Sequence, residues 1–257
     1  MRRLATIAGL VGLLTLGNQA WAEQLTVALS TPEIRIGSNF SGVPVTVFGV
    51  IEPDAQSASH VGKYEIATLV LGPPESVVAR RKDRILGVWA NSASEIFLGA
   101  PSFYAADSTG EIADLADAEI LKRMRLGFDN IGFTYRDRVG RDNPGAAEFR
   151  EAFLRIKVKE GLYTEQAGGV GMIGKSIFRT TVWIPANAPI GFYQVSVFLL
   201  ADGELIARAG DSFTIAKTGS EQFLFNFSRN EAFIYGVVCV AMALFIGWLA
   251  GVIFRRD

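Results

Sequence analysis

Hydrophobic residues lie in short, strand-like runs over most of the chain and in one long run near its end. Several of the short runs are rich in β-branched and aromatic residues and are bounded by Pro, Gly or Ser, which is typical of β-strands. The strands expected in the first half are Gln24–Leu29, Val43–Ile51, Tyr64–Leu71, Val77–Arg80, Ile85–Ala90 and Glu95–Leu98. The charged residues 81–83 separate two of these runs, so the pattern predicts a turn there.

The middle of the chain changes to the period of a helix. Asp114–Arg125 has apolar residues at helical spacing, with acids early and bases late, which matches the helix dipole. Ala146–Lys159 places Phe149, Phe153 and Ile156 along one face. The pattern therefore predicts a helical insertion at about residues 107–165.

Strand-like runs resume in the last third of the chain. They are Ile177–Ile184, Gly191–Leu200 and Leu205–Ala216. Asp202-Gly203 between the last two is a strong hairpin signal. We expect a mainly β fold, an Ig-like β-sandwich with a helical insertion. The alternative is two small sandwiches flanking the helices, which we disfavour because the C-terminal half offers too few strands.

The first 22 residues have the pattern of a secretory signal peptide. Met1-Arg2-Arg3 is a basic n-region, 4–16 is a short apolar run, and Ala20-Trp21-Ala22 is a cleavage site of the small-x-small type. The apolar run is shorter than the about 20 residues that a span requires, which argues against a retained N-terminal anchor. Cleavage is expected after Ala22.

The long apolar run at residues 232–254 predicts a transmembrane helix. It contains no charged residue, and about 22 residues at about 1.5 Å each reach about 33 Å. Arg255-Arg256 follow directly, and positive charge stays on the cytoplasmic side. We therefore expect a single-pass protein of the inner (cytoplasmic) membrane, with a periplasmic domain at 23–231 and a cytoplasmic tail at 255–257.

Composition excludes several classes of protein. With 49% apolar residues the chain is not disordered, and its formal charge of −1 gives no electrostatic reason to bind nucleic acid. One cysteine and one histidine cannot make a disulfide, a Cys/His zinc site or a CxxCH haem site. Without the terminal segments, the exterior part carries about −4.

The residue types that carry out catalysis form no recognisable arrangement. His60 lies in a polar loop, and no GxSxG motif accompanies it. Cys239 lies inside the expected span, where low polarity disfavours a thiolate. Asp114, Asp117 and Glu119 are explained by helix-dipole stabilisation without a metal. We therefore predict no enzymatic activity and no catalytic, metal or cofactor-binding residues.

The densest basic cluster is Arg80-Arg81-Lys82 with Arg84, and Trp89 follows it. Guanidinium groups suit sulfonate, phosphate or carboxylate, so Arg80, Arg81, Arg84 and Trp89 are candidate contacts for an anion or a partner. If Arg80 and Arg84 share one face with Trp89, they would form a basic pocket with an aromatic wall. The alternative is a solvated turn whose charges protect a strand end from edge pairing.

Small residues recur every four positions in the expected span, at Cys239, Ala243, Gly247 and Gly251. They share one helix face, and Gly247 and Gly251 form a GxxxG motif. Small residues allow helix backbones to approach closely in lipid. We predict that Ala243, Gly247 and Gly251 pack against a second helix, either of another copy or of a membrane partner.

Several phrases together resemble one known family. They are residues 37–42 (GSNFSG), 80–89 (RRKDRILGVW), 101–104 (PSFY), 185–193 (PANAPIGFY), 221–223 (EQF) and 247–255 (GWLAGVIFR). The chain is similar over nearly its whole mature length to the alphaproteobacterial putative transmembrane protein family, which has a signal peptide, an exterior domain and one C-terminal span. The function of this family is unknown. Members of this family are often encoded near sulfite-exporter-type permeases, so the resemblance implies an accessory role in anion export.

Two functions are consistent with these patterns. The first is a non-enzymatic accessory or interaction subunit of a membrane transport or envelope complex. The second is a periplasmic binding or sensor domain for a small anion. A tail of only three residues cannot signal alone, so the second hypothesis also needs a partner within the membrane.

Overall fold

The structure is a computed structural model of the chain. It describes residues 24–37, 39–52, 64–85, 87–132, 134–136, 146–217, 228–229 and 231–253. The predicted signal peptide, His60 and the cytoplasmic tail lie outside the described residues.

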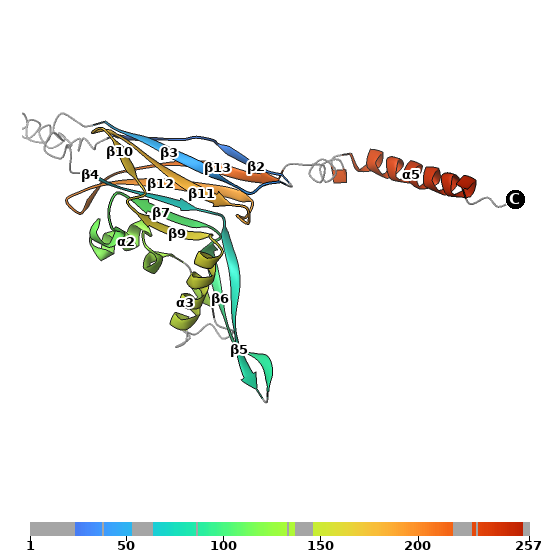
Figure 1. The fold of residues 1–257 in the computed structure, drawn as a ribbon, viewed down its shortest axis with the longest axis horizontal. Coiled ribbons are helices and arrows are strands. Elements are labelled where there is room, and N and C mark those ends of the chain that lie inside the picture. The colour runs from blue at the N-terminus through green and yellow to red at the C-terminus, as the bar shows by residue number, and fades with distance from the viewer. Residues whose placement is uncertain are drawn as a thin grey trace, which may run out of the picture.

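Two stacked β-sheets form the body of the protein (Figure 1). The first has the strand order β1 (Gln24–Leu29), β3 (Gly42–Glu52), β11 (Ile177–Pro185), β10 (Gly171–Ile173). The second has the order β2 (Glu33–Ile36), β13 (Glu204–Lys217), β12 (Gly191–Ala201), β4 (Tyr64–Leu71), β7 (Tyr104–Ser108), β9 (Tyr163–Ala167). Strands from both halves of the chain pair in each sheet, β3 with β11 and β4 with β12. The fold is therefore one interrupted sandwich and not two small ones.

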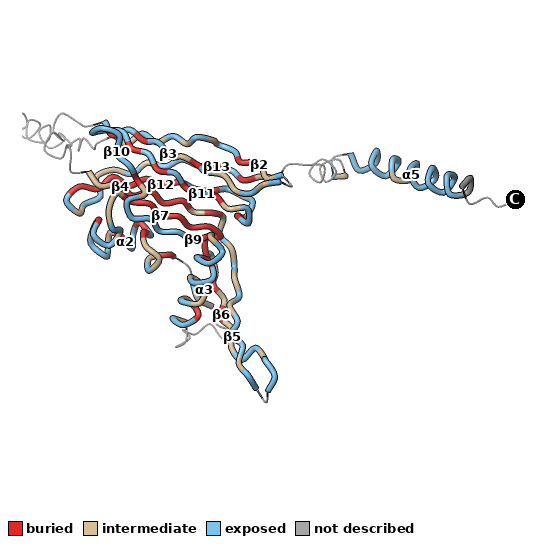
Figure 2. The backbone as a smooth tube through the Cα atoms, viewed as in Figure 1, coloured by how far each residue is buried: buried red, intermediate tan, exposed pale blue. Residues whose placement is uncertain are grey.

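The core of the sandwich lies between its two sheets. Buried and exposed residues alternate along β11 (Figure 2). The buried set includes Phe178, Val182 and Ile184, which therefore face inward. Thr180 on the same face donates a hydrogen bond of 2.6 Å to Asp107 of β7, in the other sheet. Burial raises the pKa of Asp107, and the hydrogen bond from Thr180 partly opposes this effect. This bond is a polar connection between the two sheets.

Two local features fix the last two strands, β12 and β13. Asp202 and Gly203 both have positive φ, 50° and 82°, as a two-residue type I′ hairpin requires, and the predicted pairing of β12 with β13 is confirmed. At the start of β12, the Tyr193 hydroxyl donates to the carbonyl of Pro189 at 2.7 Å. A tyrosine that bonds back to the preceding corner is a hallmark of Ig-like sandwiches.

A third sheet projects from the sandwich as an arm (Figure 1). Its strand order is β5 (Pro74–Ile85), β6 (Val88–Pro101), β8 (Thr134–Arg136). The predicted turn at residues 81–83 is wrong, since these residues continue β5, whose pairing with β6 extends as far as Ile85 and Val88. Gly87 has φ 88°, which a glycine adopts without strain. The charges at 81–83 remain in an exposed strand because water solvates them there.

The helical segments lie between β7 and β9. They are η2 (Ile112–Asp114), α2 (Ala118–Met124), η3 (Phe128–Asn130) and α3 (Ala146–Lys159). The second predicted helix has the predicted bounds. The first is shorter than predicted: it begins at Ala118, after a separate 3-10 turn, and ends at Met124, before the left-handed Arg125 (φ 59°). The Tyr104 hydroxyl holds this end by bonding the Arg125 carbonyl and the Gly127 amide.

The C-terminal helix α5 (Ala232–Ile253) agrees with the predicted span. Its residues Ala232–Ala250 are long and apolar enough to cross a membrane, and none of this stretch is buried within the protein (Figure 2).

Candidate functional site: a groove beside the arm

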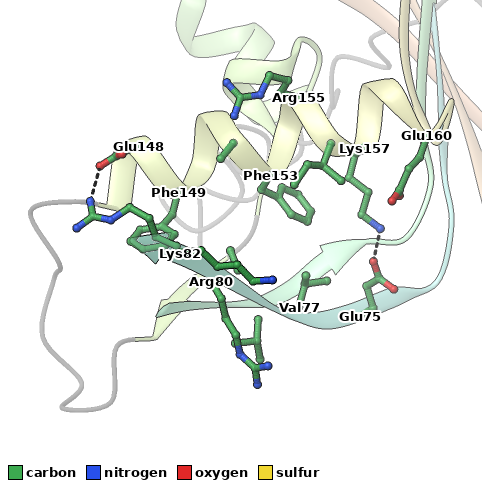
Figure 3. A pocket seen from close by; sticks show the side chains of 15 residues that line it. Glu75, Val77, Arg80, Lys82, Glu148, Phe149, Phe153, Arg155, Lys157 and Glu160 are labelled. Atoms are coloured by element: carbon green, nitrogen blue, oxygen red, sulfur yellow. Dashed lines mark hydrogen bonds and ion pairs between the residues drawn. The ribbon is translucent and has the colours of Figure 1, made fainter. Parts of the chain in front are cut away.

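A groove of about 680 Å³ lies between β5 of the arm and helix α3 (Figure 3). Its walls are one side of α3 and a run of nearly consecutive β5 residues from both faces of that strand. The lining residues of β5 are Glu75, Val77, Val78, Ala79, Arg80, Arg81 and Lys82. Those of α3 are Glu148, Phe149, Ala152, Phe153, Arg155, Ile156 and Lys157, and Glu160 lines the groove directly after the helix.

Aromatic packing holds α3 in place beside the arm. Phe149 and Phe153 lie one turn apart on the face of α3 that the sequence identified as apolar, and both are buried. The Phe153 ring packs against Phe97 of β6 with centroids 5.0 Å apart, and edge-on against Tyr163 of β9 at 5.8 Å. The Tyr163 hydroxyl donates to the Pro101 carbonyl at 2.6 Å, which ties the arm to the sandwich.

Ion pairs close the groove at both ends. Near the sandwich, the Lys157 ammonium lies 2.5 Å from the Glu75 carboxylate, and the Lys157 side chain is only 11% exposed (Figure 3). Toward the tip of the arm, Arg81 pairs with Glu148 at 3.2 Å and with Asp83 at 3.4 Å. The pairs of Arg81 are exposed to water, and each such surface pair stabilises a protein by about 0–1 kcal/mol. The groove is therefore fixed at the sandwich end and adaptable toward the tip.

The predicted basic cluster is divided between two faces of β5. Side chains alternate along a strand, so Arg81 faces α3 and pairs with Glu148, whereas Arg80 and Arg84 lie on the opposite face. Figure 3 shows Arg80 directed away from α3. Arg84 lies directly opposite Trp89 in the strand register. The structure thus brings Arg80, Arg84 and Trp89 to one face and separates Arg81 from them.

Trp89 does not wall a pocket in this arrangement. It is 67% exposed and is absent from the lining of the groove. Together with Ile85 and Val88, which are 52% and 68% exposed, it forms an apolar tip on the arm. We call these three residues the arm tip.

The basic residues on the outward face of β5 carry free charge. Across the described part of the chain, no ion pair is formed by Arg80 or Lys82, and Arg84 donates only to the Gly87 carbonyl, at 3.4 Å. Their register partners on β6 are Ser94, Asn91 and Trp89, none of which is acidic. Among the described residues, no carboxylate compensates the positive charge of this face, and the domain as a whole has an excess of acids.

The sequence did not identify the acidic and basic residues that end the groove, Glu75, Glu148 and Lys157. Glu75 and Lys157 are separated by 82 positions, and Arg81 and Glu148 by 67. No local pattern reports such pairings. The signals that pointed to this region were the apolar spacing of Phe149 and Phe153 and the basic cluster at residues 80–82.

In α5, the small residues Ala243 and Gly247 lie in a stretch of which nothing is buried, so none of the other described segments covers this helix face. Gly251 continues the same face at the end of the helix.

A β-sandwich with a projecting arm, followed by one apolar C-terminal helix long enough to cross a membrane, defines a membrane-anchored protein with a single span. The chain belongs to the family described as Putative transmembrane protein (Alph_Pro_TM), whose model matches residues 24–256. The resemblance noted from the sequence is thereby confirmed. No curated protein matches the chain.

Proposed function

We propose that this protein is a non-enzymatic accessory subunit that binds another protein of a membrane transport or envelope complex. The helix α5 holds it in the inner membrane, and the domain at 23–231 lies in the periplasm. The signal-peptide pattern at 1–22 and the two arginines after the span support this orientation.

The observation that carries the proposal is the arm with its exposed tip. The side chains of Ile85, Val88 and Trp89 are exposed to water, so they do not stabilise the sandwich by burial. Tryptophan and arginine are the residues that most often dominate binding energy at protein interfaces. An apolar tip beside Arg80 and Arg84 is therefore well suited to contact a partner. The face of α5 formed by Ala243, Gly247 and Gly251 would add a second contact, within the membrane.

The second candidate function is the binding of a small anion. It is supported by the side chains of Arg80 and Lys82, which lack a carboxylate partner in the described structure. A sulfate-sized ion would fill only a small part of the groove, and Arg81 is already paired with carboxylates. Titration of the purified protein with sulfate distinguishes the two functions, because a partner-binding arm should show no saturable heat.

The double variant Arg80→Ala/Arg84→Ala should lose the partner without losing the fold. Both side chains are exposed, so the melting temperature should move by less than about 2 °C. We expect the amount of partner that co-purifies with the full chain in mild detergent to fall at least about fivefold, as measured by quantitative mass spectrometry.

The matched control is Lys175→Ala/Arg179→Ala, which removes two exposed bases from the sandwich. It should co-purify as the wild type does. A large fall in melting temperature with unchanged recovery would instead show that Arg80 and Arg84 are structural.

The variant Gly247→Leu/Gly251→Leu tests the contact within the membrane. Leucine keeps the span hydrophobic, so insertion should survive, while the larger side chains block close approach of a second helix. Crosslinking to a partner helix or to another copy should decrease at least about fivefold. Val238→Leu/Phe245→Leu, on the opposite helix face, is the control. Equal crosslinking of both variants and the wild type would show that α5 serves as a membrane anchor without packing against a second helix.

A further inference from the structure

The groove follows a free strand edge. Among the residues that the structure describes, β5 is the outermost strand of the arm and pairs only with β6. The lining of the groove comes from the β5 segment and from the helix α3 and its end, and includes no residue of β6. The groove therefore runs along the open edge of β5 and not across the face of the sheet.

The backbone of β5 presents hydrogen-bonding groups to this groove. In an antiparallel pair, alternate residues direct both N–H and C=O either to the partner strand or away from it. The Arg81 carbonyl accepts a hydrogen bond from Ser92 of β6, at 3.4 Å, and so points toward β6. Because this direction alternates from residue to residue, the backbone N–H and C=O groups of Val78, Arg80 and Lys82 point away from β6, toward the groove. An open edge of this kind is a template for an additional strand.

The two faces of an added strand would meet different surfaces. Side chains on its α3 side would contact Val77, Ala79 and Ile156, the last of which is 54% exposed. Side chains on its other side would lie beside Arg80 and Lys82, which form no ion pair with any residue that the structure describes. Because strand side chains alternate, a matching segment alternates apolar with acidic residues.

We propose that an extended segment of a partner protein, with alternating apolar and acidic residues, adds to the edge of β5 as a fourth strand of the arm. This inference rests on the proposed partner-binding function. Helix α3 would form the wall of the site, as helices do beside other edge strands that take up peptides. The β5 edge of a second copy is a poor occupant, because it would bring a second set of Arg80, Lys82 and Arg84 to the same sheet face.

The test uses the full chain in detergent micelles and a fluorescent decapeptide of alternating Glu and Val, with binding followed by anisotropy. The alternating Lys and Val peptide is the charge control and should bind at least about tenfold more weakly. Two further peptides carry N-methyl groups on all Val or on all Glu residues. Strand addition needs only one of these two sets of N–H groups, so one methylated peptide should lose at least about tenfold in affinity and the other much less.

Hydrogen exchange of the full chain supplies an independent measurement. The Glu–Val peptide should slow the outward amides of Val78, Arg80 and Lys82, which side-chain contacts alone would not do. Arg80→Glu/Lys82→Glu should reverse the preference, so that the Lys–Val peptide binds better. Lys175→Glu, on an exposed turn of the sandwich, should leave both affinities unchanged.

Equal binding of both N-methylated peptides and the parent peptide, or equal binding of the acidic and basic peptides, would overturn strand addition. Absence of peptide binding, with loss of the native partner in Arg80→Ala/Arg84→Ala, would reject this inference and leave the proposed function standing. Absence of peptide binding, with unchanged recovery in that variant, would reject both.

Discussion

Phe153→Ala should destabilise the β-sandwich domain by about 3–5 kcal/mol, which corresponds to a fall in melting temperature of about 10 °C. The side chain is 4% exposed, and its ring contacts Phe97 of the arm and Tyr163 of the sandwich. Its removal leaves a cavity where the helix, the arm and the sandwich meet. Thermal unfolding of the full chain in detergent, followed by circular dichroism, measures the effect.

The matched control lies one turn away on the same helix. Ile156→Ala removes an exposed side chain, so it should change stability by less than about 0.5 kcal/mol. It should still weaken binding of the Glu–Val peptide, because Ile156 lines the groove. Equal melting temperatures for the two variants would show that α3 is not anchored through Phe153.

The elements that the sequence predicted best are those specified by their own residues. α3 has the helical spacing of Phe149 and Phe153, and the span α5 is apolar throughout. The hairpin between β12 and β13 follows from Asp202-Gly203, a pair that tolerates positive φ. In each case the local pattern and the final environment agree, so a single window of sequence is sufficient.

The strand β7 was not predicted because its sequence, YAADS, has little preference for β structure. It is a strand because β4 and β9 pair with it on both sides and bury all of it. The turn of the arm was misplaced for the opposite reason. Charged residues at 81–83 favour a turn locally, yet they are tolerated in a strand whose edge is open to water.

The basic cluster was identified from the sequence, but its division was not. Which face each residue takes depends on the register of β5 with β6 and on the position of α3. Arg81 meets Glu148 only because the chain returns after 67 residues and places the start of α3 beside the arm. The groove itself is a product of this return, so no motif could have predicted it.

Tyr193→Ala should have an effect comparable to Phe153→Ala, about 3–5 kcal/mol, because it removes a buried ring at the corner that starts β12. The Tyr193 ring stacks on Phe213 with centroids 5.0 Å apart and lies against Phe103 at 5.7 Å. Burial, with a smaller contribution from the charge of Glu75, raises the pKa of Tyr193 above its ordinary value. The hydroxyl is therefore protonated at physiological pH and donates to the Pro189 carbonyl.

Tyr193→Phe separates the hydrogen bond from the ring. The phenyl group keeps the stacking on Phe213, and water can reach the half-buried Pro189 in place of the lost donor, so the cost should be about 1 kcal/mol, or about 3 °C. Thermal unfolding of both variants gives the comparison. If Tyr193→Phe lowered the stability as much as Tyr193→Ala does, the hydrogen bond to Pro189, and not the ring packing, would be what stabilises the corner. A negligible cost for both would mean that the pairing of β12 with β4 and β13 holds this strand without the corner.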